Sequence, residues 1–485
     1  MSEKPQLIED LYLYDEHFRD TIGTVDADGK RVWVYPRKPS GRYHRARIWV
    51  TTFLLSLLFS GPFITIGGQP LLLLNVFERR FVILGQIFWP QDFYLLALLG
   101  IIFFVFIILF TVVFGRIWCG WACPQTLFME MVFRKIEYWI EGDANQQRKL
   151  NAAPWTTGKI IKKGAKFSIF LLISVLIAHT AMAYLVGIEE VKALVTSPPS
   201  ENLAGFIGLI AFTGIFFSVF MWFREQACIA VCPYGRLQGV LLDKQSIAVM
   251  YDWLRGEKRG KIKKGQEAAP DQGDCIDCRL CVHACPTGID IRNGTQLECV
   301  NCTACIDACD EVMEKVEKPK GLIRYSSHSA IAEGAKTLIT RRVKAYSVVL
   351  MVLLGIFAFA LTGREDVEVT ILKVPGQLYQ RQEDGSISNL YNITFVNKTD
   401  EEQRLALQVA GYPGAAISRV GGEPAIIVPA SGQAEGVFFI SIPEDHLQSS
   451  RNTVDIYLYR GEERIQELDA GFLAPPKRAT QTPKE

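Results

Sequence analysis

The sequence predicts a multidomain membrane protein with five transmembrane helices, a cysteine-rich domain inserted before the fifth helix, and a C-terminal β-sandwich. Three observations support this fold class. Five apolar runs are long enough to cross a bilayer, and all twelve cysteines fall in regularly spaced sets. The segment after the fifth run alternates short β-rich stretches with turn residues, as an all-β domain does.

The five apolar runs each approach the roughly 20 residues that a transmembrane helix needs. They are Ile48–Ile66, Phe93–Phe114, Phe167–Gly187, Leu203–Phe223 and Ala345–Thr362. They divide the chain into an N-terminal segment 1–47, a four-helix transmembrane core 48–223, a cysteine-rich domain 224–344, a fifth transmembrane helix 345–362 and a β-domain 363–485.

Lys and Arg residues alternate between the segments that connect the first four runs. There are nine in 1–47, two in 67–92, nine in 115–166 and one in 188–202. Because positively charged loops stay in the cytoplasm, the N-terminus and the cysteine-rich domain are predicted to be cytoplasmic and the β-domain to lie outside. The first residues contain no apolar h-region, so we expect no cleaved signal peptide.

Eight cysteines form two runs of the pattern C-x2-C-x2-C-x3-C. The first run, Cys275, Cys278, Cys281 and Cys285, is followed by Pro286, and the second, Cys299, Cys302, Cys305 and Cys309, is followed by Asp310. Zinc ribbons use two distant C-x2-C pairs and disulfide frameworks belong to oxidising compartments, so neither fits this cytoplasmic pattern. The spacing indicates a bacterial-type two-cluster ferredoxin domain, hence a protein that transfers electrons.

In such a domain, the fourth cysteine of each run ligates the other cluster. The sequence therefore predicts two [4Fe–4S] clusters with crossed ligation. One is held by Cys275, Cys278, Cys281 and Cys309, and the other by Cys299, Cys302, Cys305 and Cys285.

The other four cysteines form two C-x3-C-P motifs, Cys119 with Cys123 and Cys228 with Cys232. Each motif follows a long apolar run, at the predicted cytoplasmic end of the second and fourth helices. On a helix, positions i and i+4 share a face, while the proline marks a break or a new helix start. An internal repeat of two helical hairpins would bring all four thiols together beside the cysteine-rich domain. Buried packing thiols are the plain alternative, but four in two matched frames favour a soft-metal or redox site.

Other motifs restrict the chemistry. There is no C-x2-C-H haem attachment, no dinucleotide-binding G-x-G-x-x-G after a strand and no P-loop, so electrons must come from a separate donor or from quinol. The basic connector 253–274 fits a loop beside anionic lipid headgroups rather than a nucleic-acid site. His179 lies within the third run, where it is either functional or hydrogen-bonded to a neighbouring helix.

The motifs W-C-G-W-A-C-P and C-I-A-V-C-P, five spans, a two-cluster ferredoxin segment and a β-rich tail together resemble the FixG/RdxA/CcoG family over essentially the whole chain. The resemblance implies an immunoglobulin-like tail, a place in the bacterial inner membrane, and a role as accessory protein in assembly of the cbb(3)-type cytochrome oxidase, through reduction of cupric to cuprous copper. The membrane and ferredoxin parts are also similar to the NapH and NosR electron-transfer proteins. NapH lacks the β-rich tail, and the chain shows no N-terminal flavin-binding domain of the NosR kind. Asp310 departs from the pattern, since a ferredoxin usually has proline there.

Residues and resemblance together predict a cupric reductase. Electrons would pass from the two clusters to a copper site made by Cys119, Cys123, Cys228 and Cys232, because soft thiolates favour Cu(I). The alternative is a quinol-coupled electron-transfer subunit of the NapH/NosR type, with the four thiols as relay or packing residues. A scaffold that only docks partners does not account for eight cluster ligands. The expected partners are copper ions, oxidase assembly factors, a donor (ferredoxin, flavoprotein or quinol) and a second copy of the chain as a homodimer.

Overall fold

The computed structural model describes residues 24, 28, 30–261, 272–334, 339–399 and 401–476. The chain divides into two compact units, Met1–Ala358 and Phe359–Glu485. The first unit contains the long helices and the cysteine-rich domain, and the second contains the β-domain.

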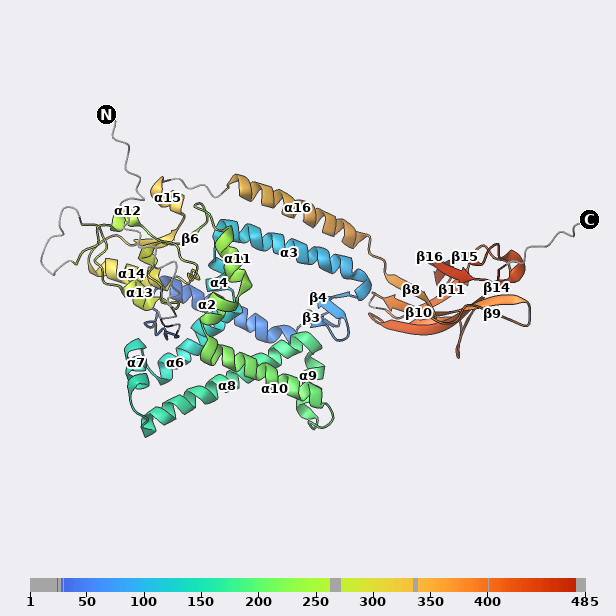
Figure 1. The fold of residues 1–485 in the computed structure, drawn as a ribbon, viewed down its shortest axis with the longest axis horizontal. Helices are drawn as coiled ribbons and strands as arrows, with labels where there is room; N and C mark the ends of the chain where they lie inside the picture. Colours follow the sequence, from blue (N-terminus) through green and yellow to red (C-terminus); the bar gives the residue numbers. More distant parts are fainter. Residues whose placement is uncertain are drawn as a thin grey trace, which may run out of the picture. The chain divides into compact units, whose positions relative to one another are not determined.

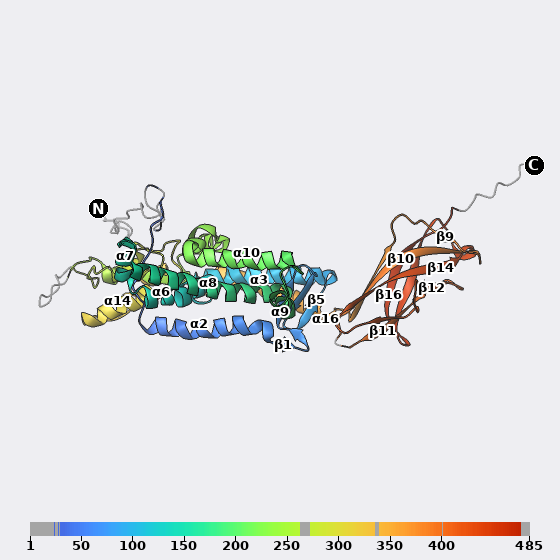
Figure 2. The ribbon, with the colours of Figure 1, turned by 90° about the horizontal axis from the view of Figure 1, so that it is seen from below.

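Five helices in the described part of the chain are long and apolar enough to cross a membrane, as the sequence predicted. They contain α2 (Arg42–Ser60), α3 (Phe93–Phe114), α8 (Thr157–Val186), α10 (Leu203–Ser218) and α16 (Arg341–Thr362). The first four lie lengthwise beside one another and alternate in chain direction (Figures 1 and 2). α8 begins at Thr157, well before the predicted Phe167, because the Thr156 hydroxyl caps its first turn by accepting a hydrogen bond from the Lys159 backbone N–H.

Phenylalanine side chains pack the helices against one another. Phe133 stacks on Phe220 with ring centroids 4.4 Å apart, and Phe170 of α8 meets Phe133 edge-on at 4.6 Å. All three are buried, so aromatic packing holds α8 to the segments that follow α3 and α10. None of the α16 side chains is buried.

Short elements connect the spans. On the loop after α2 are β1 (Thr65–Ile66), β2 (Gln69–Pro70), β3 (Leu72–Asn75), β4 (Arg80–Ile83) and β5 (Gln86–Phe88). After α3 come α4 (Ile117–Trp121), α5 (Pro124–Thr126), the π-helix η4 (Leu127–Phe133), α6 (Arg134–Ile140) and α7 (Ala144–Ala152). α9 (Ile188–Thr196) precedes α10, which runs directly into the π-helix η5 (Val219–Phe223). A break at Arg224 separates it from the π-helix η6 (Ala227–Val231) and α11 (Pro233–Leu241).

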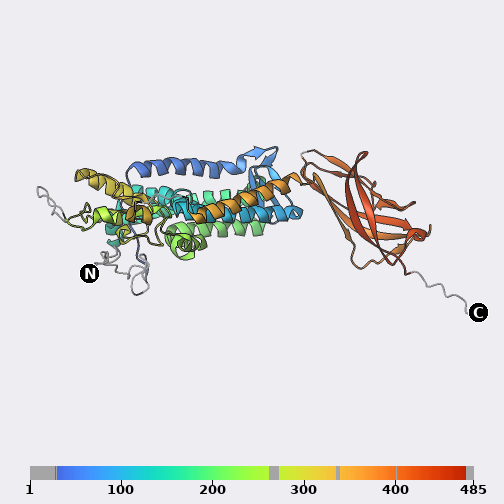
Figure 3. The same ribbon diagram turned by 90° about the horizontal axis from the view of Figure 1, so that it is seen from above.

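The cysteine-rich domain lies at the end of the helices where α2 begins, and strands β3 and β4 lie at the opposite end (Figures 1 and 3). Its β6 (Ala248–Tyr251) pairs antiparallel with β7 (Ile323–Ser326). Around this ribbon lie α12 (Trp253–Gly256), α13 (Leu280–Ala284), α14 (Ala304–Lys315) and α15 (His328–Ala332). The buried cysteines pack with Val249, Ile291 and Ile306, so the cysteine loops belong to the apolar core of the domain.

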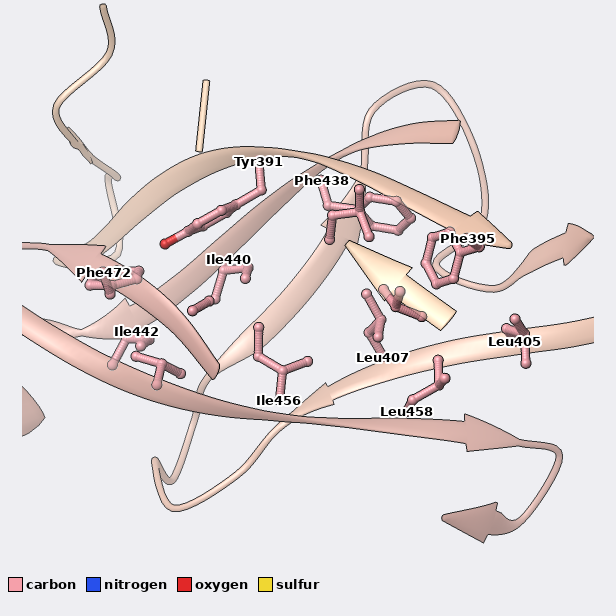
Figure 4. Close-up of a cluster of buried hydrophobic side chains, with 14 of the residues drawn as sticks. Tyr391, Phe395, Leu405, Leu407, Phe438, Ile440, Ile442, Ile456, Leu458 and Phe472 are labelled. Atoms are coloured by element: carbon pink, nitrogen blue, oxygen red, sulfur yellow. The ribbon is translucent and has the colours of Figure 1, made fainter. Parts of the chain in front are cut away.

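The β-domain is a sandwich of two antiparallel sheets. One has the order β12 (Ala416–Arg419), β14 (Gln433–Pro443), β10 (Ser386–Asn397), β8 (Val367–Lys373), with β9 (Gln380–Arg381) also on β10. The other has the order β13 (Ile426–Val428), β11 (Gln403–Val409), β15 (Arg451–Arg460), β16 (Glu463–Leu473). Side chains of both sheets meet between them, among them Tyr391, Phe438, Leu405 and Leu458 (Figure 4).

Candidate functional site

The eight cysteines of the two long runs line two neighbouring cavities. Cys275, Cys278, Cys281 and Cys309 line one cavity, and Cys285, Cys299, Cys302 and Cys305 line the other, which also touches Cys281. The remaining walls are mainly apolar, with Ile291 in one and Met313 in the other. This grouping is the one that crossed ligation requires, and four thiols around an apolar space fit an iron–sulfur cluster.

The two cysteine runs share an unusual backbone conformation. Asp277 and Arg279 in the first run have φ of 50° and 54°, and Asn301 and Thr303 at the equivalent places in the second have 53° and 65°. Non-glycine residues seldom adopt this left-handed region. Turns of this kind point successive backbone N–H groups into one concave surface that favours an anion, as a thiolate-ligated cluster is.

Asp310 changes the local structure after its cysteine. Pro286 follows Cys285, where the five-residue helix α13 has ended, whereas α14 continues through Asp310 for twelve residues in all. A proline at 310 would remove a helical N–H and clash with the preceding turn. Asp310 also accepts a hydrogen bond from the Gly321 N–H at 2.8 Å, which ties the loop after α14 to the helix.

The two C-x3-C-P motifs repeat one backbone pattern. Gly115 ends α3 with φ 56° and ψ −130°, and Arg224 ends η5 with φ 53° and ψ −123°, four residues before the first cysteine in each case. The second cysteine of each motif is extended, and the proline after it begins α5 or α11. The thiols of a pair therefore do not lie on one continuous helical face, which corrects that part of the sequence prediction, while the predicted helix start at each proline is observed.

The four thiols of these motifs are neighbours. Cys228 interacts electrostatically with the other three, and Cys119 with Cys123 and Cys232. Burial raises the pKa of Cys119 to about 11 and that of Cys228 to about 12. Both are therefore protonated at neutral pH unless a cation stabilises the thiolate, and the Cys119 Sγ–H donates to Gln238 Oε1 at 3.1 Å.

The thiols do not close around a point. Among the residues that the structure describes, no group of three or more His, Cys, Asp or Glu side chains converges tightly enough to enclose one metal ion. In a cubane each thiolate binds a different iron, so the cluster cavities do not need such convergence. At the C-x3-C-P motifs, the arrangement is an open set of thiols rather than a closed four-ligand cage.

The first C-x3-C-P motif packs directly on the second ferredoxin-type run. Cys119 and Cys302 belong to one buried cluster with Val300, Ala304 and Ala308. A Cβ added at Gly120 would lie 2.5 Å from the Val300 carbonyl oxygen, so only glycine allows this approach. Tyr325 reinforces the contact, since its hydroxyl donates to the Asn301 carbonyl at 3.0 Å and accepts from the Trp121 indole N–H at 2.8 Å.

A buried ionic network supports the second motif. Glu137 accepts hydrogen bonds from both terminal nitrogens of Arg224 at 2.7 and 2.8 Å, and pairs with Lys166 at 3.0 Å. Burial alone would raise the pKa of Glu137, but Arg224 and Lys166 outweigh it and lower the pKa to about 2. Arg224 has the left-handed backbone conformation that precedes the second motif. Its ion pair with Glu137 therefore stabilises this strained residue.

A third cavity adjoins the second motif and the ferredoxin-type domain. Cys228, Met129 and Glu130 line it together with Pro286, Thr287 and Val300. Thr287 directly follows the proline after Cys285, so the cavity adjoins both sets of cysteines.

Arg47, Gly120 and Gln238 contribute to the junction, and the sequence prediction did not single them out. Arg47 counted only as a positive charge before the first span, and Gly120 is one of 39 glycines. The sequence offered one signal of the close approach at Gly120, namely a glycine directly after Cys119 where the second motif has Ile229. His179 was a candidate, but its Nδ1 contacts the Val175 carbonyl of its own helix at 2.7 Å rather than a neighbouring helix.

Three family models match the chain. A "4Fe-4S dicluster domain" covers residues 223–328, and the "IG-like fold at C-terminal of FixG" covers 357–475. A "4Fe-4S binding domain" covers 96–142, which contains Cys119 and Cys123 but none of the eight ferredoxin-type cysteines. The fold and these domains define a membrane-bound iron–sulfur electron-transfer protein.

Curated relatives extend over most of the chain. Protein RdxB of Cereibacter sphaeroides is 36% identical across 82% of this chain and 86% of its own, and Protein RdxA of the same organism is 34% identical across 85% and 90%. Nitrogen fixation protein FixG of Rhizobium meliloti is 32% identical across 85% and 87%. The chain belongs to the FixG/RdxA family.

Proposed function

We propose that this protein is a membrane-bound cupric reductase, in which electrons pass from two [4Fe–4S] clusters to Cu(II) held by Cys119, Cys123, Cys228 and Cys232. The observation that supports it best is the packed contact of Cys119 and Gly120 with Val300–Cys302. It leaves only covalent and van der Waals steps between the predicted cluster ligand Cys302 and Cys119, the first of the four thiols.

The route has a direction. The clusters, when bound, supply one-electron storage. Cys278 is exposed and lines the cavity of the first cluster, whereas Cys302, which lines the other, is buried against Cys119. A soluble one-electron donor would thus reach the first cluster from the cytoplasm, and the second cluster would deliver the electron to the thiols.

Copper is the substrate, and an open thiol set suits it. Thiolate ligands favour Cu(I) over Cu(II), so they assist the reduction. A substrate ion must leave again, and thiols that do not form a closed cage permit release for maturation of a cbb(3)-type oxidase, as the family resemblance implies. With the N-terminus and clusters in the cytoplasm and the β-domain outside, copper would be reduced at the cytoplasmic side of the inner membrane.

The test uses the full-length protein, purified without oxygen in detergent and reduced chemically. We expect the protein to reduce Cu(II), which EPR detects as loss of the cupric signal. The Cu(I) formed should stay on the protein until an anaerobic Cu(I) chelator removes it, and the chelator then measures its stoichiometry. Reoxidation by a quinone with no response to copper would instead establish the quinol-coupled alternative and exclude the reductase.

A further inference from the structure

Arg47 of α2 joins the two cysteine systems with one side chain. It is only 4% exposed. Its Nε donates to the Gly120 carbonyl at 3.1 Å and its Nη1 donates to the Cys302 carbonyl at 3.0 Å. Gly120 lies between the thiols of the first C-x3-C-P motif, and Cys302 is in the second ferredoxin-type run, so the guanidinium bridges donor and acceptor sides of the proposed electron transfer.

The bridge also places a permanent positive charge at this junction. A guanidinium stays protonated at all relevant pH values, and its planar fork fixes two acceptors in one geometry. The nearby Trp121–Tyr325–Asn301 contact is a neutral clasp of the same two loops. The Arg47 bridge and the neutral Tyr325 contact therefore join the same two loops, but only the Arg47 bridge adds a charge.

A fixed charge beside a cluster affects its reduction potential, which depends on net charge, hydrogen bonding and burial. A desolvated cation stabilises the more negative, reduced form, because Coulomb interactions are strong where water is excluded. Loss of the charge should therefore lower the potential of the cluster that Cys302 would ligate, and leave the other cluster almost unchanged.

We propose that Arg47 is the positioning residue for electron transfer from the second cluster to the four thiols, and that its charge sets the potential of that cluster. The inference rests on the proposed function. With the clusters bound, the second would supply one electron that reduces Cu(II) to Cu(I), and a cytoplasmic one-electron donor protein would replace that electron through the first. The protons of the thiols would leave to solvent when copper binds, before the electron moves, and Arg47 forms no bond to copper.

The experiment compares Arg47→Gln, which removes the charge, with Arg47→Lys, which keeps the charge but loses the fork. Arg45→Gln is the matched control, because Arg45 lies on the same helix and is exposed. Tyr325→Phe breaks the neutral clasp without a charge change. Readouts are iron per chain, EPR-monitored redox titration of both clusters, and the rate of Cu(II) reduction by prereduced protein.

We expect Arg47→Gln to lower the potential of one cluster and to slow copper reduction about tenfold, the scale of a small misplacement. Arg47→Lys should restore the potential but not the full rate, while Arg45→Gln and Tyr325→Phe leave both potentials unchanged.

Unchanged potentials and rate in Arg47→Gln would overturn the proposal. If that variant loses iron, Arg47→Lys decides: a wild-type potential with a slowed rate supports it, and a shifted potential of both clusters contradicts it. A wild-type protein that reduces no copper would defeat the proposed function alone, since the potentials still test Arg47.

Discussion

The two C-x3-C-P motifs share one backbone frame but have different surroundings. The first is packed against the ferredoxin-type domain, with Gly120 in contact with the Val300 carbonyl and Cys119 buried. The second has Ile229 in the place of Gly120, and its Cys228 lines a cavity beside Met129 and Glu130. Under the proposed function, the first motif would receive electrons from the ferredoxin-type domain and the second would admit copper.

The largest expected effect comes from removing either pair of thiols. Cys119→Ser with Cys123→Ser should lower copper reduction by a hundredfold or more, and Cys228→Ser with Cys232→Ser should do the same, because members of one site are not additive. All four changes together should cost little more. Summed partial losses would show two independent sites and end the single-site model.

Iron content is the control for these variants. It should stay at about eight per chain, the content of two cubanes, in wild type and in both double variants. About twelve irons in the wild type, falling to about eight in the variants, would mean that the C-x3-C-P thiols hold an iron–sulfur centre of their own instead of copper. About four would contradict the two-cluster assignment.

A smaller effect should distinguish the motifs. In Gly120→Ala, the new methyl group would meet the Val300 carbonyl oxygen and push the first motif away from the second cluster. We expect copper reduction to fall about ten- to a hundredfold at unchanged iron content. Ile229→Ala, the matched position of the second motif, should have little effect. Equal rates for the two variants in stopped-flow measurements would remove the proposed asymmetry.

The last comparison concerns the stability of the two motifs rather than copper reduction, because different partners hold the arginines that flank them. Glu137→Gln removes the nearest carboxylate from both Arg224 and Lys166. Among the described residues, only Glu225 at 3.7 Å and Glu141 at 3.3 Å then balance these two buried charges, so we expect a loss of about 3 kcal/mol in stability. Arg116 instead donates through Nε to the neutral Gln238, and Gln238→Ala should cost only about 1–3 kcal/mol. Unfolding of the detergent-solubilised variants measures both, and the reverse order would show that the ionic network is not what supports the second motif.

The β-domain illustrates what sequence patterns can miss. The β-rich stretches of the sequence correspond to β8, β10, β11, β13, β14 and β15 within four residues at each end. These stretches are Val367–Val374, Leu390–Asn397, Leu405–Val409, Ala425–Val428, Gly436–Ile442 and Thr453–Tyr459. β9, β12 and β16 were not predicted. β12 and β16 lie at sheet edges. In β16, Leu468, Ala470 and Phe472 alternate toward the core, but the charged residues of Glu463–Asp469 between and before them hide this pattern in the sequence.

The sequence by itself determined the five spans, because apolar run length is set by bilayer thickness. It also determined the class of cofactor, because cysteine spacing is set by cluster ligation. Only the tertiary structure decided how the cysteine sets are related. The approach of Gly120 to Val300 and the reach of Arg47 to Cys302 join residues far apart in the chain. The packing of α4 against the cysteine-rich domain creates the first contact, and that of α2 creates the second. A single sequence contains no periodicity from which such contacts follow.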